Sequence, residues 1–116
     1  FLGQDKIVGG SAEDLEGALA AEKAGADYVG IGSTFPTNTK SDIGLLGIAG
    51  LKKIREAVKI PVVAIGGINS VNFTRVLDIG VRTIAVISDI FLSDDITKKV
   101  QEYQERYEAH ARKIAY

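Results

Sequence analysis

The stretch that decides the fold lies between residues 61 and 67 and reads Pro61-Val62-Val63-Ala64-Ile65-Gly66-Gly67. Its first five residues form a continuous apolar run, which is typical of a parallel strand buried on both faces. The two glycines end the run, and a helical pattern follows with Phe73, Val76 and Leu77 on one face. A strand that turns through glycine into a helix is part of a βαβ unit, so this stretch predicts an α/β protein.

The same unit occurs four times along the chain. The apolar runs that predict strands are Lys6–Gly9, Tyr28–Gly32, Pro61–Ile65 and Thr83–Ile87. A helical pattern follows each run. The first helix is expected to start at Ser11 as its N-cap and to end at Gly25, the third to close at Gly80, and the fourth to begin near Ser93. Strands that alternate with helices indicate right-handed crossovers and a parallel sheet.

Length and composition limit the classes of protein to consider. The 116 residues, 46% of them hydrophobic, predict a single folded domain over residues 1–116. A net charge of −1 gives no general attraction to nucleic acid or anionic lipid. No apolar run approaches the roughly 18 residues of a membrane span. The absence of cysteine suits a reducing compartment, so we expect a cytoplasmic location. The chain opens just before a strand and lacks an initial Met, so we expect a piece of a longer protein.

Residues suited to holding an anion follow the last two predicted strands. In β/α folds, functional groups lie in the loops after the C-terminal ends of the strands. Gly66-Gly67 lets the backbone approach a ligand, and the helix start beyond it offers unpaired N–H groups. Ile87-Ser88-Asp89 has the same position after the fourth strand. The pair of loops is typical of phosphate-binding (β/α)8 barrels, although either loop alone is also a common ligand-free turn.

A second polar segment follows the strand Tyr28–Gly32 and reads Thr34-Phe35-Pro36-Thr37-Asn38-Thr39-Lys40. Threonine hydroxyls donate from short stems, and lysine adds a strongly hydrated point charge. This set suits a cluster of anionic oxygens. The alternative interpretation is a polar turn with a solvated lysine.

The other polar residues have structural interpretations. The only histidine, His110, belongs to the heptad-like series Ile96, Val100, Tyr103, Tyr107, His110 and Ile114, for which packing is expected. Glu22 lies on the apolar face of the first helix, where a paired carboxylate is expected. Four aspartates are interpreted as helix caps or solvated charges, namely Asp42, Asp89, Asp94 and Asp95. No cluster in the sequence has metal-ligand spacing.

In their order and spacing, these segments resemble the thiamine phosphate synthase family along nearly the whole chain. The matching stretches are Gly9-Gly10-Ser11, Ala24–Gly32, Phe35–Asp42, Ile60–Ile68 and Ala85–Ser88. The threonine–lysine segment is the specific part, because a Gly-Gly-Ile strand end occurs in many phosphate-binding barrels. The resemblance implies four βα units with parallel strands that form the C-terminal half of a (β/α)8 TIM barrel, with its phosphate-binding face.

The resemblance also implies a transferase of thiamine biosynthesis. It would join hydroxymethylpyrimidine pyrophosphate to thiazole phosphate, with Mg²⁺, and release pyrophosphate. The residues implied to contact pyrophosphate are Ser11, Thr37, Thr39 and Lys40. Lys40 would also stabilise the leaving charge during catalysis. The thiazole phosphate would be held by backbone N–H groups of Gly67, Ile87 and Ser88. The Mg²⁺ aspartates would belong to the absent N-terminal half.

Two other functions stay open. One is a thiazole tautomerase of the same fold, against which the Thr37-x-Thr39-Lys40 element argues. The other is a non-catalytic half-barrel that binds phosphate. Because four βα units cannot close a barrel, the outer strands would be open edges. We therefore expect a homodimer or a complex with the missing half-barrel. The alternative is that the last helix folds back and shields the sheet within one chain.

Overall fold

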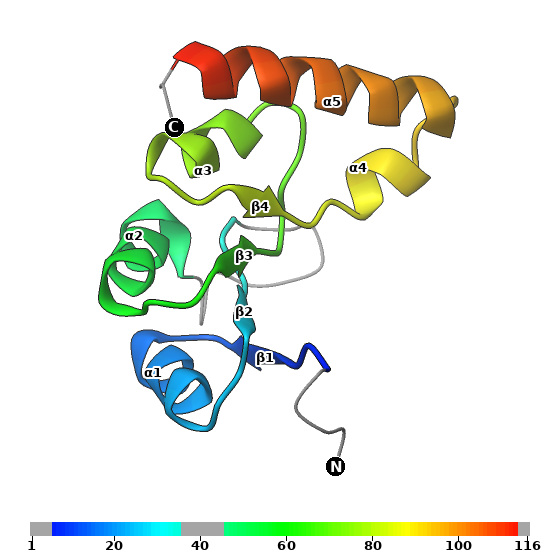
Figure 1. Cartoon of the computed structure of the whole chain (residues 1–116). Helices are drawn as coiled ribbons and strands as arrows, with labels where there is room; N and C mark the ends of the chain where they lie inside the picture. Colours follow the sequence, from blue (N-terminus) through cyan, green and yellow to red (C-terminus); the bar gives the residue numbers. More distant parts are fainter. Residues whose placement is uncertain (1–5, 36–45, 114–116) are drawn as a thin grey trace.

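The computed structural model describes residues 6–35 and 46–113. Strands and helices alternate along these ranges (Figure 1). The strands are β1 (Gly9–Ala12), β2 (Tyr28–Ile31), β3 (Val62–Ala64) and β4 (Thr83–Ile84). The helices are α1 (Leu15–Lys23), α2 (Gly47–Ala57), α3 (Phe73–Asp78), α4 (Ser88–Phe91) and α5 (Ile96–Lys113). In the described ranges, no helix has both the length and the apolar character needed to cross a membrane.

The four strands form one parallel sheet in the order β1-β2-β3-β4. The register places Ser11 opposite Gly30, and Ala64 of β3 opposite both Ile31 and Ile84. Neighbours in sequence are therefore neighbours in the sheet, as in a (β/α)8 barrel. This confirms the predicted α/β fold of four βα units, and it brings the C-terminal ends of all four strands to one edge.

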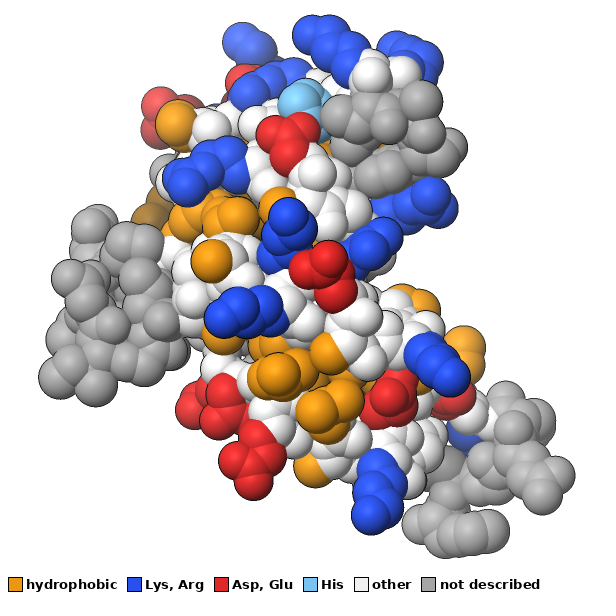
Figure 2. All heavy atoms as spheres, turned by 90° about the vertical axis from the view of Figure 1, so that its left-hand side faces the viewer, with side chains coloured by type: hydrophobic (Ala, Val, Ile, Leu, Met, Phe, Trp, Pro, Cys, Tyr) orange, Lys and Arg blue, Asp and Glu red, His pale blue; other side chains and the backbone are white. Residues whose placement is uncertain are grey.

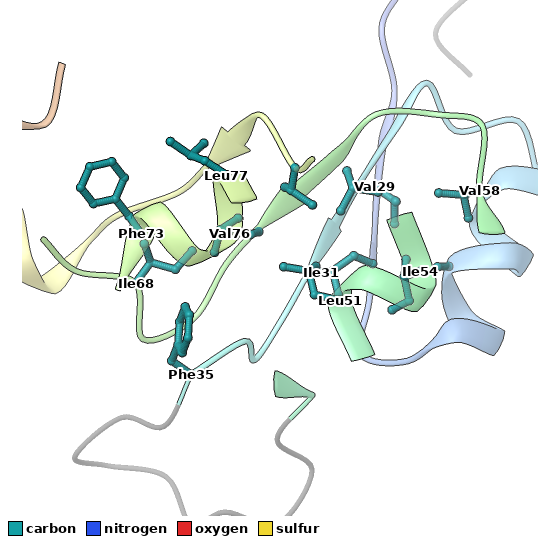
Figure 3. Close-up of a cluster of buried hydrophobic side chains, with 14 of the residues drawn as sticks. Val29, Ile31, Phe35, Leu51, Ile54, Val58, Ile68, Phe73, Val76 and Leu77 are labelled. Atoms are coloured by element: carbon teal, nitrogen blue, oxygen red, sulfur yellow. The ribbon is translucent and has the colours of Figure 1, made fainter. Parts of the chain in front are cut away.

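The hydrophobic core lies between this sheet and the helices beside it. Figure 1 shows α1, α2 and α3 on the same side of the column of strands. Figure 3 labels fully buried side chains from β2, α2 and α3, among them Val29, Ile31, Leu51, Ile54, Phe73 and Leu77. Burial of each such side chain contributes about 1.5–3 kcal/mol. Val29, Gly30 and Ile31 are buried, so β2 is covered on both faces, whereas Tyr28 at its start stays 40% exposed.

The first strand lies further along the chain than predicted. It covers Gly9–Ala12 rather than Lys6–Gly9, because the ladder to β2 begins at the pair Gly9 and Tyr28. The residues before β1 are held by a side chain instead of a strand ladder: the Val8 N–H donates at 2.8 Å to Oδ2 of Asp27, the residue before β2. Ser11 is consequently a strand residue and not a helix cap. The N-cap of α1 is Asp14, whose Oδ1 accepts from the Gly17 N–H at 2.7 Å.

The fourth strand is shorter than predicted. β4 ends at Ile84 rather than Ile87, and the Ala85 N–H adds one more bond to the Ala64 carbonyl at 2.9 Å. The chain then leaves the sheet and enters α4 at Ser88. The predicted start of the last helix near Ser93 is close to the observed one, since Asp95 Oδ1 accepts from the Lys98 N–H at 3.0 Å, in the first turn of α5.

Helix α5 packs back onto its own chain. The Tyr103 ring is buried and meets the Phe73 ring edge-on at a centroid distance of 5.3 Å. The Tyr107 hydroxyl donates to the Arg82 carbonyl, and His110 Nε2 lies 2.6 Å from Asp78 Oδ1. The packing interpretation of this helix face therefore holds for its middle. The residues at its start, Ile96 and Val100, are exposed.

A carboxylate also supports the connection between α2 and β3. Glu22 Oε2 accepts from the backbone N–H groups of Lys59 at 2.5 Å and Ile60 at 3.3 Å. This agrees with the expectation of a paired carboxylate, although its partners are backbone amides and not a cation.

Candidate functional site

Three described segments meet at the edge of the sheet where the strands end. They are residues 32–35 after β2, residues 65–70 after β3 and residues 85–89 after β4. This is the edge at which β/α proteins place their functional groups.

The turn after β3 has a backbone that only glycine adopts easily. Gly66 has φ +96° and Gly67 has φ +69°. A Cβ on Gly67 would collide with the Phe35 carbonyl oxygen, and one on Gly66 would collide with Ser33 Oγ. The two glycines therefore allow both a left-handed backbone and a close approach of the preceding strand end.

The carbonyl groups of this turn are fixed from the side of β2. The Ile65 carbonyl accepts from both the N–H and the hydroxyl of Thr34, at 3.0 and 3.1 Å. The Gly66 carbonyl accepts from the Phe35 N–H at 3.0 Å. In a trans peptide the N–H points opposite to the preceding carbonyl. These bonds therefore turn the N–H groups of Gly66 and Gly67 away from the end of β2.

Two asparagines fix the next peptide in the same way. Asn72 Nδ2 donates to the Gly67 carbonyl at 2.9 Å, which turns the Ile68 N–H away from Asn72. Asn72 Oδ1 accepts from the Asn69 N–H at 2.9 Å, and Asn69 Oδ1 accepts from the Asn72 N–H at 3.0 Å. No described residue accepts from the N–H groups of residues 66 to 68. Successive free N–H groups of this kind form a concave anion site.

The segment after β4 adds a second set of donors. Ile87 is exposed and precedes α4, which begins at Ser88. Within the described ranges, neither the Ile87 nor the Ser88 N–H donates to a protein acceptor. The Ser70 N–H donates to Asp89 Oδ2 at 3.1 Å, which joins the two loops three residues beyond Gly67 and one beyond Ser88. The structure thus brings together the predicted phosphate ligands Gly67, Ile87 and Ser88.

Asp89 is neither a simple cap nor a solvated charge, which corrects the sequence interpretation. Its Oδ2 also accepts from the Tyr103 hydroxyl at 2.5 Å and lies 3.6 Å from Lys99 Nζ. Burial alone would raise the pKa of Asp89, but the bonds from Tyr103 and Ser70 and the charge of Lys99 together lower that pKa below its usual value. The pKa of Tyr103 is raised, first by burial and then by its bond to Asp89.

The predicted pyrophosphate ligands are not assembled by the described residues. Ser11 lies on β1 and is separated from β3 by β2. Thr37, Thr39 and Lys40 lie outside the described residues, as does Asp42. The residues on either side of that gap are placed: Phe35 lies against Gly67, and the Leu46 N–H donates to the Ser33 carbonyl at 2.9 Å. The two residues that flank the gap, Phe35 and Leu46, therefore both lie at the edge that carries the candidate anion site.

The described residues offer no group of three or more His, Asp or Glu side chains that would hold a metal ion. A cavity of about 440 Å³ lies at the other edge of the sheet, beside Pro61 and Thr83, where β3 and β4 begin. Its lining includes the exposed cations Arg55 and Lys59. Because it faces away from the glycine turns, it does not belong to the candidate site.

Sequence reasoning missed the side chains that hold the loops. The pair Asn69 and Asn72, three residues apart before a helix, matches a reciprocal capping pattern and was detectable. Thr34, at the start of the threonine–lysine segment, was given no role of its own; it is fully buried, and its hydroxyl donates to the Ile65 carbonyl. The link between Asp89 and Tyr103 has no sequence signal, because it joins residues of different elements.

Comparisons with known proteins show which family the chain resembles. A family model described as thiamine monophosphate synthase matches residues 1–90. A thiamine-phosphate synthase of Pyrococcus furiosus is 56% identical over 96 residues, which are 83% of this chain and 46% of the relative. A thiamine-phosphate synthase of Clostridium botulinum is 52% identical over 97 residues, which are 83% of this chain and 47% of the relative.

A solved structure shows the same arrangement. The thiamine phosphate pyrophosphorylase from Pyrococcus furiosus superposes with a TM-score of 0.81 at 51% sequence identity. The match covers 90% of this chain and 50% of that one. The chain therefore spans about half the length of the relatives that it matches.

Proposed function

Because the chain belongs to the thiamine monophosphate synthase family, we propose that it supplies the phosphate-binding part of a thiamine phosphate synthase. The complete enzyme would couple hydroxymethylpyrimidine pyrophosphate to thiazole phosphate and release pyrophosphate. Residues 1–116 would act as one folded unit in a cytoplasmic biosynthetic enzyme. Membership of the family supports this class of reaction, and the loops of this chain support the binding roles proposed for its residues.

One observation carries the proposal: the N–H groups of Gly67, Ile87 and Ser88, which donate to no described residue, lie on two loops that a hydrogen bond joins. Backbone N–H groups at the ends of parallel strands suit a phosphate monoester, because they donate without a side chain that must be ordered. Thiazole phosphate is the substrate of this reaction that carries such a group. We therefore assign these three residues to the thiazole phosphate.

The threonine–lysine segment is proposed to hold the other substrate. Breaking the C–O bond to pyrophosphate leaves a pyrimidine cation, which then joins the thiazole, and a pyrophosphate anion. Hydroxyls of Thr37 and Thr39 would bind the pyrophosphate oxygens, and Lys40 would stabilise the charge that develops on them. Ser11 is the weakest member of this set, since it lies in an edge strand two positions from β3.

Magnesium would neutralise part of the pyrophosphate charge when bound. The described residues do not fit such a site, because they form no cluster of acidic or histidine ligands. We propose that its ligands come from the rest of the barrel, and we assign no step of the reaction to it here.

We propose that the rest of the barrel covers two exposed apolar edges. Beside β1 the exposed residues are Ile7, Val8, Leu15, Leu19 and Tyr28. Beside β4 they are Val71, Ile87, Phe91, Leu92, Ile96 and Val100. The occupant would be four further βα units, since the relatives are about twice as long as this chain and eight strands close a filled barrel.

The direct test is an assay for thiamine phosphate. The chain is mixed with the remaining half of the Pyrococcus furiosus relative, and product and pyrophosphate are measured. We expect turnover only in the mixture, and a Lys40→Ala chain should lose roughly 10²-fold or more, as for removal of one preorganised electrostatic group. Lys52→Ala, an exposed lysine on α2, is the matched control and should keep turnover.

The outcomes separate the alternatives. Phosphate binding without turnover in a mixture shown to assemble would favour a non-catalytic half-barrel. Turnover that Lys40→Ala leaves unchanged would remove Lys40 from the mechanism.

A further inference from the structure

Asp89 occupies an unusual position for a carboxylate. It is the second residue of α4 and directly follows Ser88, one of the proposed phosphate ligands. A negative charge beside an anion site opposes anion binding by Coulomb repulsion. The contacts of Asp89 indicate a role that compensates for this repulsion.

One oxygen of Asp89 joins three segments of the chain. Oδ2 accepts from the Ser70 N–H at 3.1 Å, from the Tyr103 hydroxyl at 2.5 Å, and lies 3.6 Å from Lys99 Nζ. Ser70 belongs to the connection between β3 and α3, whereas Tyr103 and Lys99 are on α5. The carboxylate therefore ties α4 to the glycine turn on one side and to the long helix on the other.

Besides Asp89, helix α4 is held by Ile90, which is partly buried and packs against the core. The helix has four residues and none of them is fully buried. Its Phe91 and the following Leu92 are largely exposed, and the strand before it has only two residues. A hydrogen bond to a charged group is stronger than one between neutral groups, so the bonds to Asp89 are strong anchors for this short element.

Tyr103 in turn is firmly placed. Its ring is buried against Phe73 at a centroid distance of 5.3 Å, and Lys99 Nζ lies 6.0 Å from the ring centroid. Because the ring cannot shift without disturbing the core of α3, its hydroxyl is a fixed point for the carboxylate. Lys99 offsets the charge of Asp89, which reduces its repulsion of a nearby anion.

We propose that Asp89 is a positioning residue for phosphate binding, which holds the Gly67 and Ser88 loops at a fixed spacing with Tyr103 as its support. The inference rests on the proposed function, since it names a residue that acts on the same site. Asp89 does not touch the phosphate in this account. It sets where the N–H donors of the two loops lie relative to each other.

Positioning and simple electrostatics predict opposite results when the carboxylate is removed. If Asp89 acted only through its charge, Asp89→Ala and Asp89→Asn would both tighten phosphate binding. If it positions the loops, Asp89→Ala weakens binding, because α4 loses its link to Ser70. Tyr103→Phe should also weaken binding, since it removes only the hydroxyl and keeps the ring on Phe73.

The experiment measures the dissociation constant for inorganic phosphate from amide shifts of Gly67 and Ser88 in the full chain. The melting temperature of each variant is recorded by circular dichroism. We expect Asp89→Ala to raise the dissociation constant roughly tenfold and Tyr103→Phe by a few fold, as for the loss of one bond to a charged group. Asp89→Asn keeps an acceptor and should lie between Asp89→Ala and the unaltered chain.

Asp14→Ala is the matched control. Asp14 also accepts a backbone N–H through one carboxylate oxygen, but it caps α1 away from the anion loops. This variant should lower the melting temperature and leave phosphate affinity unchanged. Affinity that stays equal or tightens in Asp89→Ala and Tyr103→Phe, while the unaltered chain binds phosphate, overturns the inference alone. An unaltered chain that shows no phosphate-dependent shift overturns both this inference and the proposed phosphate site.

Discussion

The conformation of Gly67 links a single residue to the anion site. The bond from the Phe35 N–H to the Gly66 carbonyl turns the Gly67 N–H away from the end of β2. Gly67 itself has φ +69°, and the close approach of the Phe35 carbonyl leaves no room for a Cβ there. Gly25 has a similar backbone, with φ +98°, but no atom would lie within 4 Å of a Cβ there. Substitutions at both positions share the strain of a left-handed backbone, but only a substitution at Gly67 also creates a steric clash. Comparing the two therefore distinguishes these two effects.

We predict that Gly67→Ala weakens phosphate binding and that Gly25→Ala does not. Each substitution places alanine in a left-handed backbone, which destabilises by about 1–2 kcal/mol. Only Gly67→Ala must also displace Phe35 and the peptide that carries the Gly67 N–H. Urea denaturation and phosphate titration of both variants check this. Equal phosphate affinity in the two variants would show that the turn is a ligand-free connection.

Single residues also show which features of the site could be predicted from the sequence and which could not. The glycine turn, Ile87 and Ser88 were predicted because turn chemistry is local and its position after a strand is visible in the pattern. The role of Asp89 was not, because its partners Ser70 and Tyr103 lie 19 and 14 residues away. Contacts of that kind depend on how the elements pack, which a single sequence does not specify.

At the scale of elements, local signals predicted the helices better than the strand limits. Asp95 marks the start of α5 and Gly80 follows the end of α3, as capping chemistry suggests. β1 was misplaced because its residues Gly9–Ala12 have low strand propensity and are held by their pairing with β2. β4 was overextended because the apolar run continues after the chain has left the sheet.

The hydrogen bond from Tyr103 of α5 to Asp89 predicts that the stability of the fold depends on pH. Burial and the bond to Asp89 raise the pKa of Tyr103 above its ordinary value of about 10. The neutral hydroxyl is thus favoured in the folded state, so its contribution to stability is fully present below pH 10 and is lost as the pH rises through the folded-state pKa. We predict that Tyr103→Phe is less stable than the unaltered chain at pH 7, and that the difference narrows toward pH 11.

Urea denaturation at pH 7, 9 and 11 measures this difference. Tyr107→Phe serves as the control, since it removes a hydroxyl from the same helix that bonds to a backbone carbonyl instead of a carboxylate. A difference between Tyr103→Phe and the unaltered chain that stays constant up to pH 11 would contradict the account of the Asp89–Tyr103 bond.

In the molecule as a whole, the exposed apolar residues are explained by the open sheet, whose edge strands are β1 and β4. Figure 2 shows positive and negative side chains mixed over the outer side of the helices, with hydrophobic side chains gathered near α1 and α2. The most exposed large apolar residues, Val71, Leu92 and Ile7, lie toward the two ends of the sheet instead. Exposed strand edges and apolar patches of this kind favour association.

Sedimentation of the chain tests this surface. We predict self-association of the 12.4 kDa chain at low micromolar concentration, and its replacement by a one-to-one complex when the remaining half of the Pyrococcus furiosus relative is added. Leu92→Glu should weaken both forms of association, whereas Tyr103→Glu is unsuitable, because Tyr103 is buried within its own chain. A folded monomer that forms no complex with the added half would refute the proposal that the missing half covers the apolar edges.

The central claim is that the two loops form one phosphate site, and an amide-shift titration tests it most directly. The full chain is titrated with inorganic phosphate and with thiazole phosphate, and with sulfate at matched ionic strength as a control. The account predicts that the amides of Gly67, Ile87 and Ser88 shift together with one dissociation constant at roughly millimolar phosphate or below, with Gly25 unaffected. If these three amides show no chemical-shift change at that concentration, or changes no larger than that of Gly25, the two loops do not form a phosphate site.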